Sequence, residues 1–219
     1  MIIVIVGPTG VGKTKLSIEL AKYYKASIIN ADAVQIYKDL NIGSAKVTEA
    51  EKEGIKHYLL DIKNLDEEYS VCDYQRDARR IINDNLNQNI IFCGGTGLYI
   101  SAALMDYRFY EDDLNLTYDE YSNEELYELV LKKDNNSKID KNNRIRMIRF
   151  LNKKNIELVE PKLLYKNVIF IGLTTSRDKL YEVINKRVDK MFNDGLIDEV
   201  RRLYLSLIHI SEPTRLGMI

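Results

Sequence analysis

The first 24 residues constrain the fold more than any other part of the chain. Residues 2–6 are a run of Ile and Val that ends at Gly7, as in a buried parallel strand. The apolar spacing of residues 15–24 predicts a helix. Between strand and helix the sequence fits G-x-x-x-x-G-K-[ST], the context that a phosphate-binding loop requires. The loop consists of Gly7, Pro8, Thr9, Gly10, Val11, Gly12, Lys13 and Thr14.

Each part of this loop has a chemical task. Glycines allow backbone N–H groups to turn toward phosphate oxygens, and the N-terminus of the following helix adds its dipole. We expect Lys13 to place its charge on the terminal phosphates and the Thr14 hydroxyl to ligate Mg²⁺. The loop therefore predicts a ligand with two or three phosphates, but it does not predict that the ligand is hydrolysed.

The rest of the chain alternates between the two kinds of secondary structure. Strand-like runs are expected at residues 27–29, 58–60, 89–93 and 167–171. Helical patterns are expected at residues 48–53, 70–86, 178–192 and 196–204. This alternation predicts an α/β fold, with a P-loop NTPase-like parallel sheet flanked by helices.

One stretch interrupts the alternation. Residues 101–139 contain no strand-like run, and a capping box at residues 122–125 predicts a helix there. Residues 141–154 are rich in Lys and Arg and contain no acids. We therefore expect a P-loop α/β core made of residues 1–100 and 140–205, with a small helical insertion at 101–139.

Composition excludes several classes of protein. The 219 residues carry a net charge of −1, so a nucleic acid could be bound only by a local basic patch. Cys72 and Cys93 form neither a disulfide framework nor a metal-binding pattern. No apolar run reaches the roughly 18 residues of a membrane span. We expect a cytoplasmic monomer without a membrane partner.

Two carboxylates follow predicted strands. In parallel sheets the carboxyl ends of strands face the ligand crevice, so Asp32 is expected near the phosphate loop. It could be a Mg²⁺ partner, a general base or an ordinary loop residue. Asp61 could be a metal-binding carboxylate, a helix cap or part of an ion pair. Another strand ends in Gly94-Gly95-Thr96, which permits close backbone approach to a ligand and offers one hydroxyl.

In several ordered pieces the sequence resembles the tRNA dimethylallyltransferases, also called tRNA isopentenyltransferases. Besides the phosphate loop, residues 32–37 match D-[SA]-x-Q-[IV]-Y, residues 42–46 match I-G-[ST]-A-K, and residues 94–99 match G-G-T-G-L-Y. Residues 57–62 read H-Y-L-L-D-I, and residues 177–200 match R-x-x-L-Y-x-x-I-x-x-R-V-D-x-M followed by G-L-x-x-E-V. The resemblance covers roughly residues 1–205.

The resemblance implies a reaction. The loop would hold the diphosphate of dimethylallyl diphosphate with Mg²⁺, and the dimethylallyl group would pass to the exocyclic amine of the adenosine 3′-adjacent to the anticodon of a tRNA. Asp32 would take the proton from this amine and Thr96 would orient the donor, so that Asp32, Thr96 and Lys13 form the catalytic set. Arg187 could close over the diphosphate or be a structural surface residue.

The resemblance also implies where tRNA is bound. Contacts are expected from Asp32, Ala33, Val34 and Gln35, and from Arg146 and Arg149, which align with a family R-x-x-R. The tRNA side of the protein would thus include the helical insertion. Arg146, Arg149 and Lys153 share one helical face, with Ile145 and Ile148 on another. From the charges alone this face could equally be a solvated surface.

Three features depart from the family pattern. A family A-L-E triplet is replaced by Phe150-Leu151-Asn152, and the helical insertion is shorter than usual. Residues 206–219 match none of the segment with which the family continues. We therefore expect a C-terminally truncated member with a non-native tail at 206–219.

Three other functions share these features. A P-loop small-molecule kinase would use the same loop and fold. An adenylate prenyltransferase would use the same donor with a free nucleotide as acceptor, but the basic helix favours tRNA. A non-catalytic nucleotide sensor would need only the loop, whereas Asp32 and Thr96 favour an enzyme.

Overall fold

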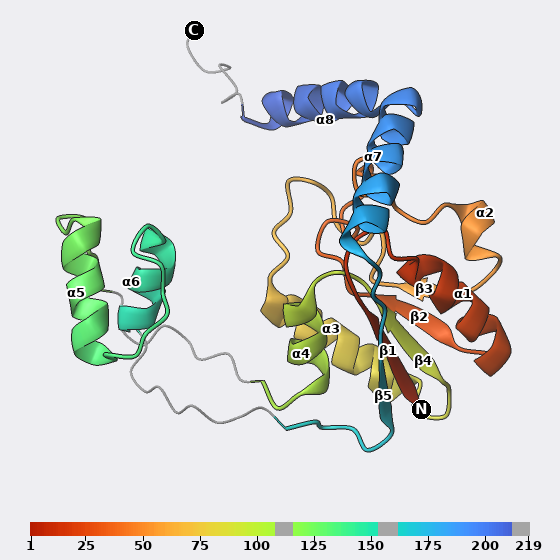
Figure 1. Ribbon diagram of the computed structural model, residues 1–219, viewed down its shortest axis with the longest axis horizontal. Helices are drawn as coiled ribbons and strands as arrows, with labels where there is room; N and C mark the ends of the chain where they lie inside the picture. Colours follow the sequence, from red (N-terminus) through yellow and green to blue (C-terminus); the bar gives the residue numbers. More distant parts are fainter. Residues whose placement is uncertain (108–115, 153–161, 212–219) are drawn as a thin grey trace, which may run out of the picture. The chain divides into compact units, whose positions relative to one another are not determined.

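The computed structural model describes residues 1–107, 116–152 and 162–211, with side chains to residue 206 (Figure 1). The strands are β1 (Ile2–Val6), β2 (Ser27–Asn30), β3 (His57–Tyr58), β4 (Ile90–Cys93) and β5 (Val168–Gly172). The helices are α1 (Lys13–Tyr24), α2 (Glu49–Lys52), α3 (Val71–Asp84), α4 (Gly97–Leu104), α5 (Asn123–Lys133), α6 (Arg144–Asn152), α7 (Arg177–Asn193) and α8 (Leu196–Ser211).

The five strands form one parallel sheet in the order β3-β2-β4-β1-β5. β1 lies between β4 and β5, so that Ile3 is paired with Ile91 on one side and Ile169 on the other. The long crossovers that parallel strands require are supplied by the helices between them. The α/β fold with a helix-flanked parallel sheet is confirmed.

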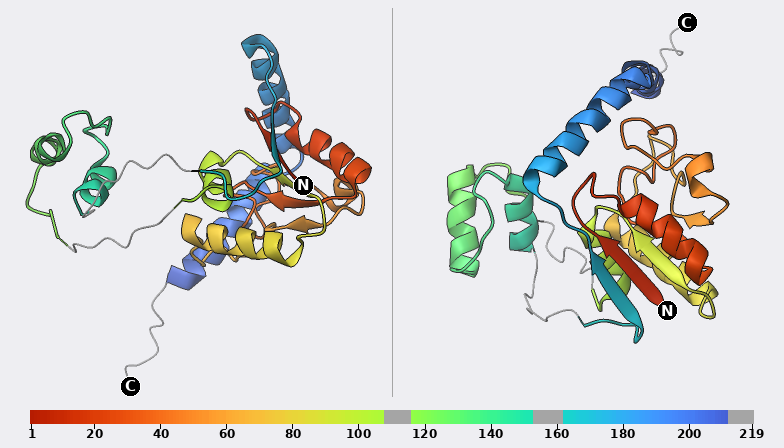
Figure 2. Two further views of the ribbon diagram at one scale, coloured as in Figure 1. Left: turned by 90° about the horizontal axis from the view of Figure 1, so that it is seen from below. Right: turned by 45° about the vertical axis from the view of Figure 1, so that its right-hand side comes forward.

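Helices cover both faces of this sheet. On one face, Val4, Ile29 and Phe92 form a core with residues of α3 and α4. On the other face, Ile3 and Ile5 pack with residues of α1 (Figures 1 and 2). Because both faces are buried, β1 and β4 are continuous apolar runs rather than alternating patterns. The sheet is thereby a rigid support for the loops at the carboxyl ends of its strands.

α4 was not predicted from the sequence. It follows the Gly94-Gly95-Thr96 segment directly and is apolar on nearly every side, with Ile100, Ala103 and Leu104 all buried. A helix with apolar residues on nearly every side lacks the polar face that creates the 3.6-residue period. Its missing amphipathic pattern explains why it was overlooked.

α7 and α8 lie beyond the carboxyl ends of the strands (Figure 1). Along α7, Leu180 and Ile184 are half-buried, while Val183 and Val188 remain more than 40% exposed. α7 contacts the phosphate loop, since a Cβ added at Gly10 would lie 3.2 Å from Val183 Cγ1. The apolar side chains of α7 are therefore only partly buried, in part against the phosphate loop.

A second compact unit comprises residues 108–161. In its described part, α5 and α6 share a core of Leu126, Val130, Ile139, Met147 and Leu151. The expected boundaries of 101 and 139 were wrong at both ends. α4 packs in the main unit, because its apolar side chains complete the sheet core, whereas the basic helix α6 packs on α5.

Within the described residues, no helix combines the length and apolar character needed to cross a lipid bilayer.

Candidate active site

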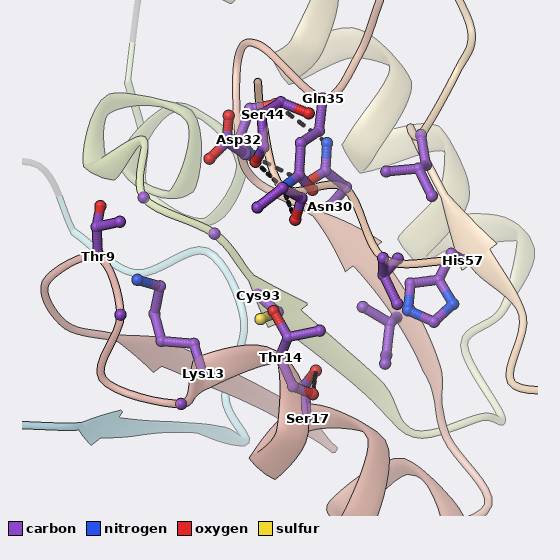
Figure 3. A pocket seen from close by; sticks show the side chains of 18 of the residues that line it. Thr9, Lys13, Thr14, Ser17, Asn30, Asp32, Gln35, Ser44, His57 and Cys93 are labelled. Carbon is purple, nitrogen blue, oxygen red and sulfur yellow. Dashed lines mark hydrogen bonds between the residues drawn. The ribbon is translucent and has the colours of Figure 1, made fainter. Parts of the chain in front are cut away.

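A pocket of about 300 Å³ lies at the carboxyl ends of β1, β2 and β4 (Figure 3). It belongs entirely to the main unit. Its walls come from the phosphate loop, the segment after β2, residues 44–47, β3, the end of β4 and α7. The lining residues are Thr9, Gly10, Gly12, Lys13, Thr14, Ser17, Ile28, Asn30, Asp32, Gln35, Ser44, Ala45, Val47, His57, Leu60, Cys93, Gly94, Gly95 and Arg187.

The phosphate loop forms one end of the pocket, where Figure 3 shows Lys13 between Thr9 and Thr14. Gly12 caps α1 with φ 94°, a left-handed conformation that favours glycine. Lys13 Nζ donates to the carbonyl oxygens of Gly7 (2.9 Å) and Pro8 (2.8 Å). The Lys13 ammonium is therefore held against the backbone of the phosphate loop. Gly7, Pro8 and Val11 are part of the loop but are not among the residues that line the pocket.

The charge balance at this end suits a polyanion. Burial lowers the pKa of Lys13, and the neighbouring Arg187 lowers it further, while Cys93 and Asp32 oppose this effect. Two cations, from the loop and from α7, thus face the same small volume. An anion bound between them would relieve their mutual repulsion and raise the pKa of Lys13 again.

Asp32 lies at the end of β2, as predicted, and is held by local hydrogen bonds. Its Oδ1 accepts from the Val34 N–H at 3.0 Å, and its own N–H donates to Asn30 Oδ1 at 3.1 Å. The second carboxylate oxygen, Oδ2, faces Gly95, since a Cβ added there would approach it to 3.8 Å. One oxygen therefore fixes the turn and the other lies on the side of Gly95, which also lines the pocket.

Asn30 supports Asp32 from beneath and was not identified from the sequence as a site residue. It is buried, and its Nδ2 donates to the carbonyl oxygens of Leu59 (2.8 Å) and Asp32 (3.1 Å). The fully buried Tyr74 of α3 donates its hydroxyl to Asn30 O at 2.9 Å. These bonds join two strands and a helix to the segment that carries Asp32.

Gly94 and Thr96 act on the same segment. A Cβ at Gly94 would lie 2.1 Å from the carbonyl carbon of Ala31, so only glycine fits there. The close approach predicted for this glycine is thus made to the protein backbone. Thr96 N–H donates to Ala31 O at 2.9 Å, and Thr96 Oγ1 accepts from Ala33 N–H at 3.1 Å. Thr96 anchors the Asp32 turn, and its contact with the donor stays a prediction.

Asp61 has a clear structural partner. Its carboxylate pairs with the ammonium of Lys46, which is almost fully buried and also donates to Tyr37 O at 2.6 Å. Among the alternatives for Asp61, the ion pair is the one found. Asp61 is also absent from the pocket lining, whereas Asp32 is present.

Ser44 and Ala45 belong to the pocket wall beside Asp32. Gln35 Nε2 donates to the carbonyl oxygens of Ser44 (3.1 Å) and Ala45 (3.4 Å), and Figure 3 shows Gln35, Ser44 and Asp32 together at one side of the pocket. Arg187 Nη2 donates to Ser44 O at 3.4 Å. Arg187 therefore lies at the pocket, in a place from which it can reach a bound anion. Ala33 is half-buried and Val34 is 49% exposed beside it.

Glu199 of α8 holds this wall from behind. Its Oε2 accepts from the N–H groups of Asn41 (2.9 Å) and Ile42 (2.8 Å), and its Oε1 accepts from Gly43 N–H (2.9 Å). Burial acts to raise the pKa of Glu199, but these three bonds outweigh it and the pKa is lowered. Sequence reasoning missed this residue. Both partners lie in pieces of the family resemblance, residues 42–46 and the G-L-x-x-E-V stretch, but nothing in the sequence joined them.

A further part of the pocket is apolar. Ile28, Val47 and Leu60 line it together with His57, which Figure 3 shows away from the phosphate loop. Burial lowers the pKa of His57, so its neutral ring is favoured, and Nδ1 lies 2.9 Å from Ile55 O. Burial also raises the pKa of the Cys93 thiol. The pocket thus combines a cationic end with an uncharged, partly apolar one.

In the small unit, Arg146 and Arg149 are exposed on α6, opposite the buried Met147. On the buried side of α6 are Met147 and Leu151, whereas Ile145 is 67% exposed. Lys153 lies outside the described residues. Arg144 does not belong to the free basic face, because it donates to the carbonyl oxygens of Tyr118 and Tyr121.

The pocket offers hard oxygen ligands of the kind that Mg²⁺ prefers. The Thr14 hydroxyl and the Asp32 carboxylate line the same space, and Ser17 Oγ holds the Thr14 carbonyl at 2.7 Å. Within the described residues no cluster of three or more His, Cys, Asp or Glu could hold a metal by protein ligands alone.

Comparison with known proteins gives a consistent result. The family model "IPP transferase" matches residues 35–217, a span that includes most of the segment expected to be non-native. Curated relatives named tRNA dimethylallyltransferase include one from Anoxybacillus flavithermus, 45% identical over 93% of this chain and 70% of its own length. Another, from Fusobacterium nucleatum, is 44% identical over 92% of this chain and 71% of its own length. The chain therefore spans about 70% of these relatives.

Solved structures agree with the sequence relatives. The full-length tRNA isopentenylpyrophosphate transferase of Bacillus halodurans is 38% identical, with a TM-score of 0.68 over 93% of this chain and 69% of its own. A eukaryotic dimethylallyltransferase, solved acting on tRNA, is 27% identical, with a TM-score of 0.82 over 97% of this chain and 57% of its own. With a family model that matches most of the chain and relatives well above 30% identity, this chain belongs to the IPP transferase family, the tRNA dimethylallyltransferases.

Proposed function

We propose that this chain transfers the dimethylallyl group of dimethylallyl diphosphate to the exocyclic amine of the adenosine 3′-adjacent to the anticodon in tRNA. The observation that carries the proposal is the composition of one pocket. It brings together a phosphate loop, the carboxylate of Asp32 and an apolar wall. Relatives named tRNA dimethylallyltransferase and a structural neighbour solved on tRNA support this assignment.

The donor fits the two ends of the pocket. Its diphosphate would lie on the loop between Lys13 and Arg187, whose charges favour a polyanion. Its five-carbon tail is apolar and would pack against Ile28, Val47 and Leu60. As the allylic C–O bond breaks, negative charge grows on the diphosphate, and these preformed contacts are stronger to that state than to the bound donor.

The acceptor side follows from Asp32. An exocyclic adenine amine is a weak nucleophile, so a carboxylate within hydrogen-bond reach assists its attack by taking the proton. The hydrogen bonds that Asp32 accepts from Val34 N–H and donates to Asn30 Oδ1 fix its position before substrate arrives. The adenine must leave its stack to reach the pocket, which costs less in a single-stranded anticodon loop than in a duplex.

Mg²⁺ is part of the proposal, with Thr14 as its protein ligand. When bound, it would neutralise charge on the leaving diphosphate. The chain itself contributes the Thr14 hydroxyl, the loop amides and Lys13, all on one side of the pocket. Arg146 and Arg149 are proposed to contact the tRNA backbone through their exposed guanidinium groups.

A transfer assay tests the proposal. The chain is incubated with Mg²⁺ and labelled dimethylallyl diphosphate in the presence of unmodified tRNA or AMP, and in parallel with labelled ATP. Label in tRNA alone is the expected result. Label in AMP would identify a free-nucleotide prenyltransferase, consumption of ATP would indicate a kinase, and binding without transfer to either acceptor would overturn the enzymatic assignment.

A further inference from the structure

Glu199 of α8 is a buried carboxylate bound to the backbone of a distant loop. It is 4% exposed, and its two carboxylate oxygens accept three consecutive backbone N–H groups, those of residues 41, 42 and 43. Gly43 lies against it, since a Cβ there would approach Glu199 Oε1 to 3.5 Å. A buried carboxylate with three donors fixes a loop far more rigidly than a single neutral hydrogen bond does.

The loop held in this way continues directly into the pocket wall, which includes Ser44 and Ala45. Directly after residue 43, the carbonyl oxygens of Ser44 and Ala45 accept from Gln35 Nε2. Because both donors of a side-chain amide are on its nitrogen, these two bonds turn the Gln35 carbonyl oxygen away from the loop. Gln35 and Ser44 lie on the Asp32 side of the pocket, across from Lys13 (Figure 3).

We infer that Glu199 is a positioning residue for the acceptor side of the pocket. It acts through the backbone of residues 41–43 to set the Ser44 and Ala45 carbonyls, and through them the Gln35 amide. This role rests on the proposed function, because the acceptor is the adenine of the proposed reaction. Glu199 itself does not line the pocket, so helix α8 would control the position of a pocket wall without contacting the substrate.

The test compares two neighbouring acids of α8. Glu199→Gln keeps the size of the side chain but replaces one acceptor oxygen with a donor, so it cannot accept all three bonds. Asp198→Asn makes the same change of charge at a side chain that is 83% exposed and pairs only loosely with Arg201. Any effect of net charge on tRNA affinity appears in both variants, and an effect of the loop appears only in the first.

The first measurement is hydrogen exchange at the amides of Asn41, Ile42 and Gly43. We expect exchange in Glu199→Gln to be faster by roughly tenfold or more, since the protecting acceptor is weakened, and unchanged in Asp198→Asn. Equal exchange in both variants and the parent would overturn the inference, because the loop would then be held by something else.

The second measurement is the kinetics of transfer to an anticodon stem-loop. Glu199→Gln should raise the KM for the stem-loop by roughly tenfold, with kcat and the KM for dimethylallyl diphosphate within about threefold. Combined with Gln35→Ala, it should add little further, because both changes disturb one contact chain. Additive effects, or equal increases in both KM values, would mean that Glu199 only stabilises the fold.

The two measurements separate this inference from the proposed function. If the parent chain transfers no label, the proposed function fails, and the acceptor role of Glu199 fails with it. The exchange data would still decide whether Glu199 holds residues 41–43.

Discussion

The buried ammonium of Lys46 donates a hydrogen bond to the carboxylate of Asp61, 15 positions further along the chain, and Lys46 follows directly after the wall residues Ser44 and Ala45. Asp61 follows a strand, as a metal-binding carboxylate would. The sequence around it therefore cannot distinguish a metal ligand from an ion-pair partner. Because Asp61 is paired with Lys46, mutation should affect stability if Asp61 is an ion-pair partner and the Mg²⁺ requirement if it is a metal ligand.

Asp61→Asn should destabilise the protein without altering its chemistry. It leaves a nearly buried ammonium with one carbonyl partner, Tyr37 O, and we expect a loss of about 1–2 kcal/mol in the free energy of unfolding, since Asp61 itself is partly exposed. Denaturant titration measures this loss. Glu53→Gln, which breaks an exposed pair with Lys22, is the control and should change stability by about 0.5 kcal/mol or less. A raised Mg²⁺ requirement in Asp61→Asn would instead support a metal role.

Asp32→Asn should slow the reaction while leaving substrate binding nearly unchanged. Asparagine keeps the oxygen that accepts from Val34 N–H but cannot take a proton, so single-turnover transfer should slow by roughly 10²–10⁴-fold. Binding of tRNA and donor should stay within a few-fold of the parent. If Asp32 serves Mg²⁺ instead, added Mg²⁺ should partly restore the rate. Near-normal transfer would exclude both roles.

Lys13→Ala should abolish binding of dimethylallyl diphosphate, measured by calorimetry, because the charge facing the diphosphate is lost. The fold should persist, since the two hydrogen bonds of Lys13 go to carbonyl oxygens of its own loop. Lys15→Ala removes an equal charge from an exposed position of α1 and should retain binding. Unchanged donor affinity in Lys13→Ala would remove the loop from the donor site.

Arg146→Ala combined with Arg149→Ala should weaken tRNA binding and flatten its dependence on salt. Losing two phosphate contacts reduces the slope of log K against log salt by about 0.7–0.9 per contact. Donor binding should hardly change, because the pocket belongs to the other unit. Lys132→Ala, an exposed cation on α5, should leave the slope unaltered. If the double arginine variant and the parent show the same slope, Arg146 and Arg149 belong to an ordinary solvated surface.

Gly94→Ala should be severely destabilising. Its Cβ would lie 2.1 Å from the backbone of Ala31, a clash that no side-chain movement relieves, and we expect a loss of roughly 3 kcal/mol or more. Gly97→Ala is the matched control, because a Cβ there meets nothing within 4 Å and alanine favours the helix. Similar stability of the two variants in thermal melts would contradict the close packing of β2 and β4.

The sequence predicted elements wherever one pattern acted alone. β1 and β4 are buried on both faces and therefore appear in the sequence as continuous apolar runs. α3 is buried on one face and therefore shows the 3.6-residue amphipathic period. The phosphate loop and Asp32 were placed at one edge by topology alone.

What the sequence did not reveal depends on contacts between distant backbone groups. Glu199 accepts hydrogen bonds from three backbone N–H groups. Because nearly every residue has a backbone N–H, the amino-acid sequence does not indicate which ones a distant carboxylate will bind. Gly94 suggested room for a ligand, although its neighbour is Ala31. Met147 rather than Ile145 is buried on α6, since the packing of α5 decides which side of a short helix faces inward.

The contact of Glu199 with residues 41–43 also has a consequence for biosynthesis. These partners are separated by 156–158 positions, so at typical elongation rates the ribosome needs roughly 10–30 s to make the second after the first. During that interval the phosphate loop, β2 and β4 can assemble, but the wall beside Asp32 lacks its carboxylate anchor. A nascent chain interrupted before α8 would therefore carry a complete phosphate loop and an unfinished acceptor wall. It could retain a diphosphate while failing to hold an adenine.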